Sequence, residues 1–156
     1  MKVMGILSRR VIEGGEYPRY DLWELDTNGT MPLVKPSEEA SVEGWDSFDN
    51  LVFVFSRKGF QRANLALQRA ADEMKEGAIV FVDEYGRLES QHKGIYSGAV
   101  KVAEGLKRGG IAVFLCRDDK VSEVINLVTG RAERIFNLEA GDSEALLRII
   151  RGCSKL

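Results

Sequence analysis

The sequence predicts an α/β fold in a single domain spanning residues 1–156, and three observations support this. Residues 20–25 alternate apolar and acidic side chains, as a strand with one wet face does. From residue 51 onward, short apolar runs alternate with segments whose apolar residues recur at helical spacing, a pattern typical of βαβ units. The length of 156 residues is enough for one substantial hydrophobic core.

Residues 1–36 form the first region, which the pattern predicts to be an antiparallel β-hairpin region. Residues 2–8 are apolar and strand-like, and the alternating strand at 20–25 follows them. The turn signal Asn28-Gly29 then leads into a short returning strand that stops before Pro36, since Asn-Gly readily supplies the positive φ of a tight turn. We expect residues 36–50, which are rich in acidic side chains, to form a surface loop.

Residues 51–152 form the second region, which we expect to be a mainly parallel βαβ core with helices on both faces of its sheet. The predicted elements, in chain order, are a strand at 51–55, a helix at 59–74, a strand at 79–82, a helix at 96–107, a strand at 111–116, a helix at 120–128, a short strand at 134–138 and a helix at 143–151.

Composition excludes several classes of protein. The net charge of −2 gives no basic footprint for nucleic acid, so we expect no nucleic-acid partner. No apolar stretch is long enough to span a membrane, and the N-terminal apolar stretch is too short for a signal peptide, so we expect a cytoplasmic protein. With one His, and with Cys116 and Cys153 far apart, the chain has too few ligands for a Cys/His zinc site.

The motif that carries chemistry is the apolar strand that ends in Asp83-Glu84. It resembles the Walker B element of nucleotide hydrolases, in which the Asp holds Mg²⁺ and the neighbouring Glu orients an attacking water. Such an element works beside a phosphate loop, G-x-x-x-x-G-K-[ST]. No Lys in this sequence is followed by Ser or Thr, so that loop is not found in it.

The order of elements resembles the small P-loop nucleoside-triphosphatase family of thermophiles, the cancer-related nucleoside-triphosphatase-like proteins. Residues 83–89, Asp-Glu-Tyr-Gly-Arg-Leu-Glu, closely match the family motif D-E-[ILV]-G-x-[LM]-E, with Tyr85 at the aliphatic position. Residues 5–11 and 20–25 are similar to its β-hairpin, and residues 55–60 to its F-x-x-x-x-F segment. A basic residue follows a later strand in the family, and Arg117 stands there in this chain.

The resemblance covers residues 3–150 and has one large departure. The first strand, the phosphate loop and the first helix of the family have no counterpart, because Met1 falls where the hairpin begins. In P-loop folds that first strand lies in the middle of the sheet, so its absence should leave unpaired backbone and apolar surface. Either the sheet closes around the gap, or another chain covers it, for which a homo-oligomer is the simplest arrangement.

The resemblance also implies roles for individual residues. Asp83 is the candidate Mg²⁺ ligand, although an acidic strand end in a local salt bridge is the alternative for it and for Glu84. Glu84 and Arg117 are the candidate catalytic residues, and for Arg117 the alternative is an ion pair with Asp118 or a neighbouring carboxylate. The weaker candidates for nucleotide contact are Arg87 and Glu89 within the motif and, independently of the resemblance, the basic residues Arg9, Arg10, Arg57 and Lys58.

Three functions follow from these expectations. The leading hypothesis is a degenerate nucleoside-triphosphatase-like protein, non-catalytic alone, that binds a nucleoside triphosphate, regulates, or is completed by a protein partner carrying a phosphate loop. The first alternative is a Mg²⁺-dependent nucleotide phosphohydrolase with a different phosphate site. The second is a purely structural protein–protein module.

Overall fold

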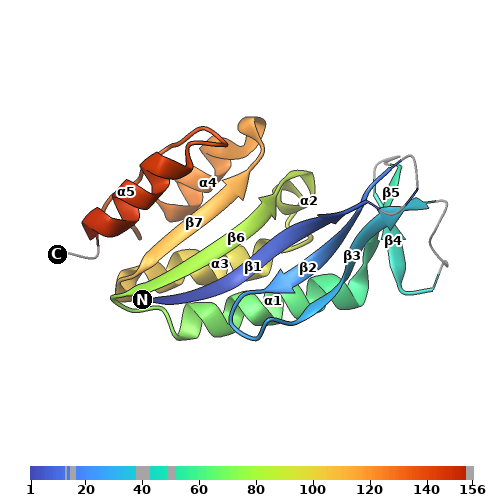
Figure 1. The fold of residues 1–156 in the computed structure, drawn as a ribbon, viewed down its shortest axis with the longest axis horizontal. Helices are drawn as coiled ribbons and strands as arrows, with labels where there is room; N and C mark the ends of the chain where they lie inside the picture. Colours follow the sequence, from blue (N-terminus) through green and yellow to red (C-terminus); the bar gives the residue numbers. More distant parts are fainter. Residues whose placement is uncertain (13, 15–16, 38–42, 49–51, 154–156) are drawn as a thin grey trace.

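The computed structural model describes residues 1–12, 14, 17–37, 43–48 and 52–153, which form one seven-stranded sheet with helices against it (Figure 1). The strands lie side by side in the order β4-β5-β3-β2-β1-β6-β7. The elements are β1 (Lys2–Val11), β2 (Arg19–Glu24), β3 (Thr30–Pro36), β4 (Trp45–Ser47), β5 (Phe53–Ser56), α1 (Arg57–Asp72), β6 (Ala78–Tyr85), α2 (Arg87–Ser90), α3 (Tyr96–Gly105), η2 (Leu106–Arg108), β7 (Ile111–Cys116), η3 (Asp118–Lys120), α4 (Val121–Val128) and α5 (Ser143–Cys153).

The sheet is mixed, so the prediction of a mainly parallel sheet is wrong. Only β1–β6 and β6–β7 are parallel among the strand pairs that the structure describes, and the pairs on the β2 side of β1 are antiparallel. The cause lies in β5, which was predicted to begin the βαβ core. It pairs antiparallel with β3 and β4, and it therefore extends the hairpin region within the same sheet.

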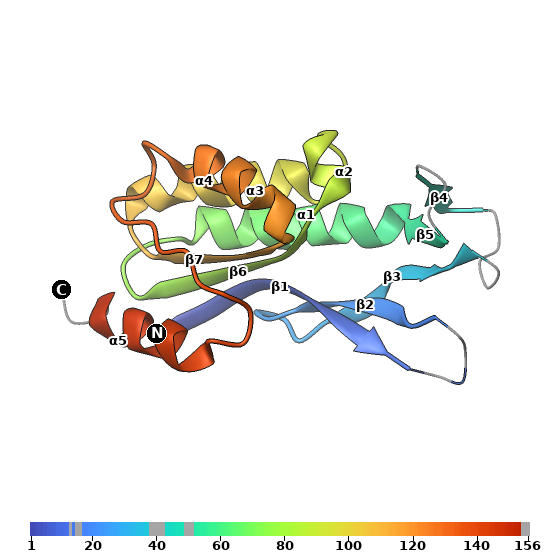
Figure 2. The same cartoon turned by 90° about the horizontal axis from the view of Figure 1, so that it is seen from above.

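The helices cover the two faces of the sheet unequally. Figure 2 shows α1, α3 and α4 against one face and α5 against the other. The main core lies under the first group, where side chains of α1 such as Leu67 and Ala70 pack on strand residues such as Val80 and Val82. On α5, Ile150 is the buried residue among those described. The expected coverage of both faces is therefore only partial on the α5 side.

Close contact between β1 and β6 depends on Gly5. Its φ is +97°, and a Cβ at this position would lie 2.1 Å from the carbonyl oxygen of Phe81 on the neighbouring strand. A side chain would therefore clash with backbone, which only glycine avoids. The register that results pairs Ile6 with Val82, and it brings Ser8 on β1 beside Asp83 on β6.

A buried ionic cluster joins the hairpin region to α1. Glu24 is 1% exposed, and its carboxylate accepts hydrogen bonds from Arg62 and, at 2.6 Å, from Arg69. Burial acts to raise the pKa of Glu24, but the two guanidinium groups outweigh it and lower that pKa. Because both arginines lie on α1, the cluster fixes this helix against β2.

Most predicted elements of the second region are confirmed within one to three residues at each end. Two differences stand out. The predicted surface loop at 36–50 contains the short strand β4, while residues 38–42 and 49–50 lie outside the described residues. The strand predicted at 134–138 is wrong, since this stretch has no regular structure and no strand partner in the described sheet.

Candidate functional site

The carboxyl end of β6 has an irregular backbone at the predicted Asp83-Glu84 motif. The register with β7 shifts between Val82 and Tyr85, so the strand bulges there. Glu84 adopts a φ of +70°, a left-handed conformation that a residue with a Cβ rarely takes. Such strain persists only where the surrounding structure holds it, and it is typical of functional sites.

Two backbone amides hold the Asp83 carboxylate. The amide of Ser8 donates to Oδ2 at 2.8 Å, and the amide of Glu84 donates to Oδ1 at 2.8 Å. Burial raises the pKa of Asp83, whereas the two amide bonds act in the opposite direction because they favour the ionised form. Each carboxylate oxygen of Asp83 can accept a further ligand, and the two amide bonds fix the direction in which it does so.

Glu84 is exposed beside this fixed carboxylate. Burial of the strand end raises its pKa, and the negative charges of Asp83 and Glu89 add to the rise. Because the residue itself reaches solvent, water screens part of this effect. A carboxylate with a raised pKa is a better proton acceptor than an ordinary one, so Glu84 is suited to accept a proton from a water molecule.

Glu89 has a structural role in the turn after β6. It is 2% exposed, and its carboxylate accepts hydrogen bonds from the amides of Gly86 and Ile95, each at 2.8 Å. Burial raises its pKa, and these amide bonds oppose the rise. A Cβ on Gly94 would lie 2.1 Å from Glu89 Oε1, so the loop closes tightly around the carboxylate. Glu89 therefore positions the loop that follows Glu84.

Arg117 lies beside the same turn, at the end of the neighbouring strand. Its amide donates to the carbonyl of Tyr85 at 3.3 Å, and its Cδ lies 3.5 Å from the place where a Cβ on Gly86 would stand. The guanidinium pairs with Asp119, at 3.0 Å from Nε to Oδ1, and both side chains are exposed. The ion-pair alternative therefore has Asp119 rather than Asp118 as its partner, and that pair is open to solvent.

Three of the predicted basic residues follow residues of this site in the sequence. Arg9 and Arg10 follow Ser8 on β1 and are exposed, and Arg87 opens α2 directly after Gly86 and is exposed. Their positions place them next to the segments that hold Asp83.

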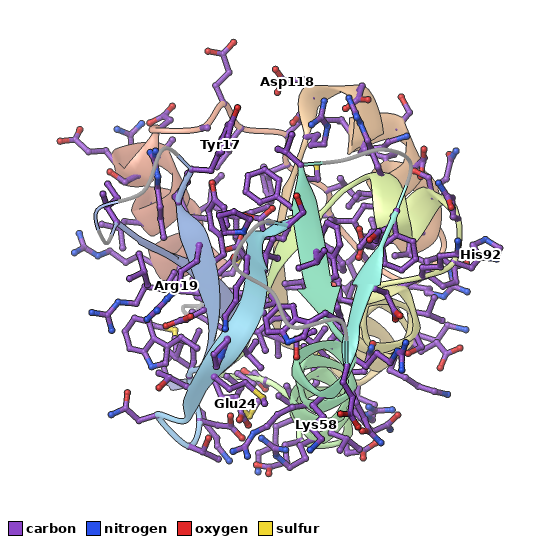
Figure 3. The ribbon with its side chains drawn as sticks, turned by 90° about the vertical axis from the view of Figure 1, so that its right-hand side faces the viewer. Tyr17, Arg19, Glu24, Lys58, His92 and Asp118 are labelled. Carbon is purple, nitrogen blue, oxygen red and sulfur yellow. The ribbon has the colours of Figure 1, made fainter. Side chains whose placement is uncertain are left out.

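Arg57 and Lys58 lie elsewhere. They begin α1, and Arg57 pairs with Asp46 of β4 at 2.7 Å. Figure 3 shows Lys58 at the lower side of the molecule and Asp118, the neighbour of Arg117, at the upper side. The structure therefore does not bring these two basic residues together with Arg117.

A metal ion would have few protein ligands at this site. The described residues contain no group of three or more His, Cys, Asp or Glu side chains arranged to hold a metal. Asp83 with Glu84 supplies at most two carboxylates. This fits Mg²⁺ that shares its coordination with phosphates and water, and it does not fit a metal site made of protein ligands alone.

Ser8 is the site residue that sequence reasoning missed. Its contribution is its backbone amide, which any residue but proline supplies, so no side-chain pattern could point to it. Only the parallel pairing of β1 with β6 places that amide on Asp83.

The fold is a mixed sheet in which Asp83 and Glu84 stand at the end of β6, the strand next to the β7 edge, between two parallel neighbours. Two solved structures match it. The solution structure of a human cancer-related nucleoside triphosphatase aligns with a TM-score of 0.63 and 21% identity, over 97% of this chain and 80% of that one. The crystal structure of THEP1 from the hyperthermophile Aquifex aeolicus aligns with a TM-score of 0.62 and 14% identity, over 96% of this chain and 81% of that one.

No protein-family model and no curated protein matches the sequence. At these identities the two structures establish the fold of this chain. Within the residues that the structure describes, no helix is long and apolar enough to cross a membrane.

Proposed function

We propose that this chain binds a nucleoside triphosphate at the carboxyl end of β6 and does not hydrolyse it alone, because its phosphate grip comes from another polypeptide segment. The observation that carries the proposal is the strained, exposed Glu84 directly after the amide-held Asp83, at the end of a parallel strand. Ligands of open α/β sheets bind at the carboxyl ends of parallel strands. One of the two structural neighbours is a human cancer-related nucleoside triphosphatase.

The geometry suits each residue of the site to a different role. Asp83 is a fixed acceptor, so it would hold Mg²⁺ or one of its waters; the ion, when bound, neutralises phosphate charge. Glu84 would orient or deprotonate a water molecule. Arg117, whose pairing with Asp119 is exposed and therefore weak, would turn to an anionic phosphate.

The phosphate grip is the part that these residues do not supply. Phosphate loops hold phosphates through successive amides and a Lys, and none of the Lys residues in the sequence is followed by Ser or Thr. This is the reason for proposing a partner-completed or regulatory subunit. The alternative, a Mg²⁺-dependent phosphohydrolase, is favoured by one observation: Arg9, Arg10 and Arg117 are exposed and adjoin the segments that carry Asp83.

Thermal unfolding with ATP, GTP and their diphosphates, each with and without Mg²⁺, tests the proposal. A ligand at 100 times its dissociation constant contributes about 2.7 kcal/mol, a rise in Tm of roughly 5–10 °C for a chain of this size. We expect a Mg²⁺-dependent rise that Asp83→Asn removes. Asp72→Asn, an exposed site on α1, is the matched control and should keep the rise.

Each other outcome has a defined meaning. A rise that survives Asp83→Asn would place the nucleotide away from β6 and refute the site. Hydrolysis by the chain alone, abolished by Asp83→Asn, would establish the phosphohydrolase alternative. If no nucleotide changes the Tm, either of the chain alone or with a strand–loop–helix peptide that supplies a phosphate loop, nucleotide binding is refuted and the structural module is what remains.

A further inference from the structure

We propose that the base of the nucleotide stacks on an aromatic surface formed by Tyr17, Tyr20 and Phe53, so that this chain binds a nucleotide in preference to an inorganic polyphosphate. The inference rests on the proposed function for the position of the phosphates, which it places at Asp83. The aromatic surface itself rests on ring contacts, on its separation from the core and on the register of the strands.

The three rings of the aromatic surface contact one another. The ring centroids of Tyr17 and Phe53 lie 6.1 Å apart at an interplanar angle of 79°, and those of Tyr20 and Phe53 lie 6.4 Å apart at 70°. An edge-to-face contact of this kind occupies one face of one ring and leaves the other faces free for a further ring. Tyr17 is 44% exposed, so a ligand can reach it from solvent. Figure 3 shows Tyr17 at the upper side of this end of the molecule, where Asp118, the neighbour of Arg117, also lies.

The aromatic surface is separate from the main core. Within the described residues, neither the core nor the side chains packed against it include Tyr17, Tyr20 or Phe53. The ring of Phe55 on the same strand differs, because it contacts Phe60, which packs against the core. Aromatic side chains that gather outside the core and stay partly exposed are typical of a surface that binds a ligand.

The register of the strands places the aromatic surface within reach of Asp83. Ser8, whose amide donates to Asp83, lies opposite Leu22 of β2. Arg10 follows two residues farther along β1, and it lies opposite Tyr20. Because β1 lies between β2 and β6, the spacing and rise of strands separate the Cα atom of Tyr20 from that of Asp83 by about 12 Å. An extended nucleoside triphosphate spans this distance, with its phosphates at Asp83 and its base at Tyr20.

Basic side chains lie between Asp83 and the aromatic surface. Arg9 and Arg10 follow Ser8 on β1, and both are exposed. Residues directly opposite on paired strands share a face of the sheet, so the side chain of Arg10 lies on the same face as the ring of Tyr20. A ligand with an aromatic ring at one end and negative charge beside it fits this arrangement, and a nucleotide has both.

Recognition by stacking predicts that the chain tolerates different bases. Every base has a ring face, and an aromatic side chain stacks on that face whatever groups the base carries at its edge. The aromatic surface offers ring faces and no fixed pattern of donors and acceptors that would select one base edge. We therefore expect ATP and GTP to bind alike, and inorganic tripolyphosphate to bind at least about fivefold less tightly than either.

Titration calorimetry of the whole chain with ATP, GTP and tripolyphosphate, each with Mg²⁺, tests the aromatic surface. We expect Tyr17→Ala to weaken the binding of ATP and GTP at least about fivefold and to leave that of tripolyphosphate unchanged, because only the stacking on the base is lost. Tyr17→Phe keeps the ring and should bind all three ligands as the parent does. Phe136→Ala, at an aromatic residue that is 53% exposed, is the matched control and should alter none of the three.

Three results would overturn the aromatic surface as the site of the base. The first is ATP binding that Tyr17→Ala leaves unchanged. The second is equal weakening of ATP and tripolyphosphate by Tyr17→Ala, since Tyr17 would then act on the phosphates or on the fold. The third is equal weakening of ATP by Tyr17→Ala and by Phe136→Ala, since the loss would then follow from removing any exposed ring.

Adenosine, which carries a base and no phosphate, separates this inference from the proposed function. If adenosine raises the Tm of the parent and not that of Tyr17→Ala, while Asp83→Asn changes the binding of no ligand, the aromatic surface stands and the site at Asp83 fails. If ATP and tripolyphosphate bind equally tightly and Asp83→Asn weakens both, the site at Asp83 stands and the aromatic surface fails. If neither adenosine nor any triphosphate binds, both fail.

Discussion

The left-handed conformation of Glu84 predicts that Glu84→Gly stabilises the protein. A positive φ costs a residue with a Cβ about 1–2 kcal/mol, and glycine removes that cost. Glycine also adds roughly 0.4–1 kcal/mol of entropy to the unfolded chain. The difference leaves the Glu84→Gly variant more stable than the Glu84→Ala variant by about 0.5–1 kcal/mol, which corresponds to a Tm higher by roughly 1–4 °C.

Glu84→Ala is the control that isolates the backbone. Both variants remove the carboxylate, so both relieve its repulsion from Asp83 and Glu89 to the same extent. Only Glu84→Gly relieves the φ of +70°. Calorimetry of the two variants and the parent, at one pH and without nucleotide, measures the difference. If Glu84→Ala unfolds at the same temperature as Glu84→Gly or above it, the strand end stores no backbone strain.

Two further substitutions test the frame that holds the site. Gly5→Ala places a Cβ 2.1 Å from the carbonyl oxygen of Phe81 and should lower the free energy of unfolding by about 2–4 kcal/mol. The control Gly77→Ala, at a φ of +80° with nothing within 4 Å of its Cβ, should lower it by about 1 kcal/mol. Equal losses of both variants in urea unfolding would contradict the clash. Glu24→Gln should lose about 1–3 kcal/mol at neutral pH. Because the pKa of Glu24 is lowered in the folded protein, the stability that its carboxylate contributes is present above its ordinary pKa of 4.5 and is lost as the pH falls through the lowered value. The stabilities of the parent and of Glu24→Gln should therefore converge in acid. Glu73→Gln, which breaks an exposed ion pair with Lys2, should change the stability little at any pH.

The sequence was sufficient to predict the strand end that carries Asp83 and Glu84. An apolar run followed by Asp-Glu predicts a buried strand whose polar residues emerge at its end, and β6 has this form. Glu89 was predicted as a nucleotide contact because it completes a motif. The structure shows it bonded to the amides of Gly86 and Ile95, a role that depends on how the loop folds back and that no spacing reveals.

The direction of the sheet could not be predicted in the same way. Residues 53–56 are a short apolar run, and such a run is equally compatible with a central parallel strand and with an antiparallel one. The direction of β5 in the sheet is set by its neighbour β3, with which it pairs antiparallel. Pairing between strands is a long-range property, so the local pattern predicts that a strand exists without predicting its neighbour.

The segment at 134–138 also shows that a local pattern does not predict whether a strand has a neighbour. Its pattern predicts a strand, and its apolar residues are exposed because no neighbour among the described strands pairs with them. β7 is the opposite case. Its uncharged apolar run predicts a strand, the strand forms, and it has a neighbour on one side only within the described sheet. The failed strand prediction at 134–138 therefore shows that a local pattern can indicate a strand for which the described sheet offers no neighbour.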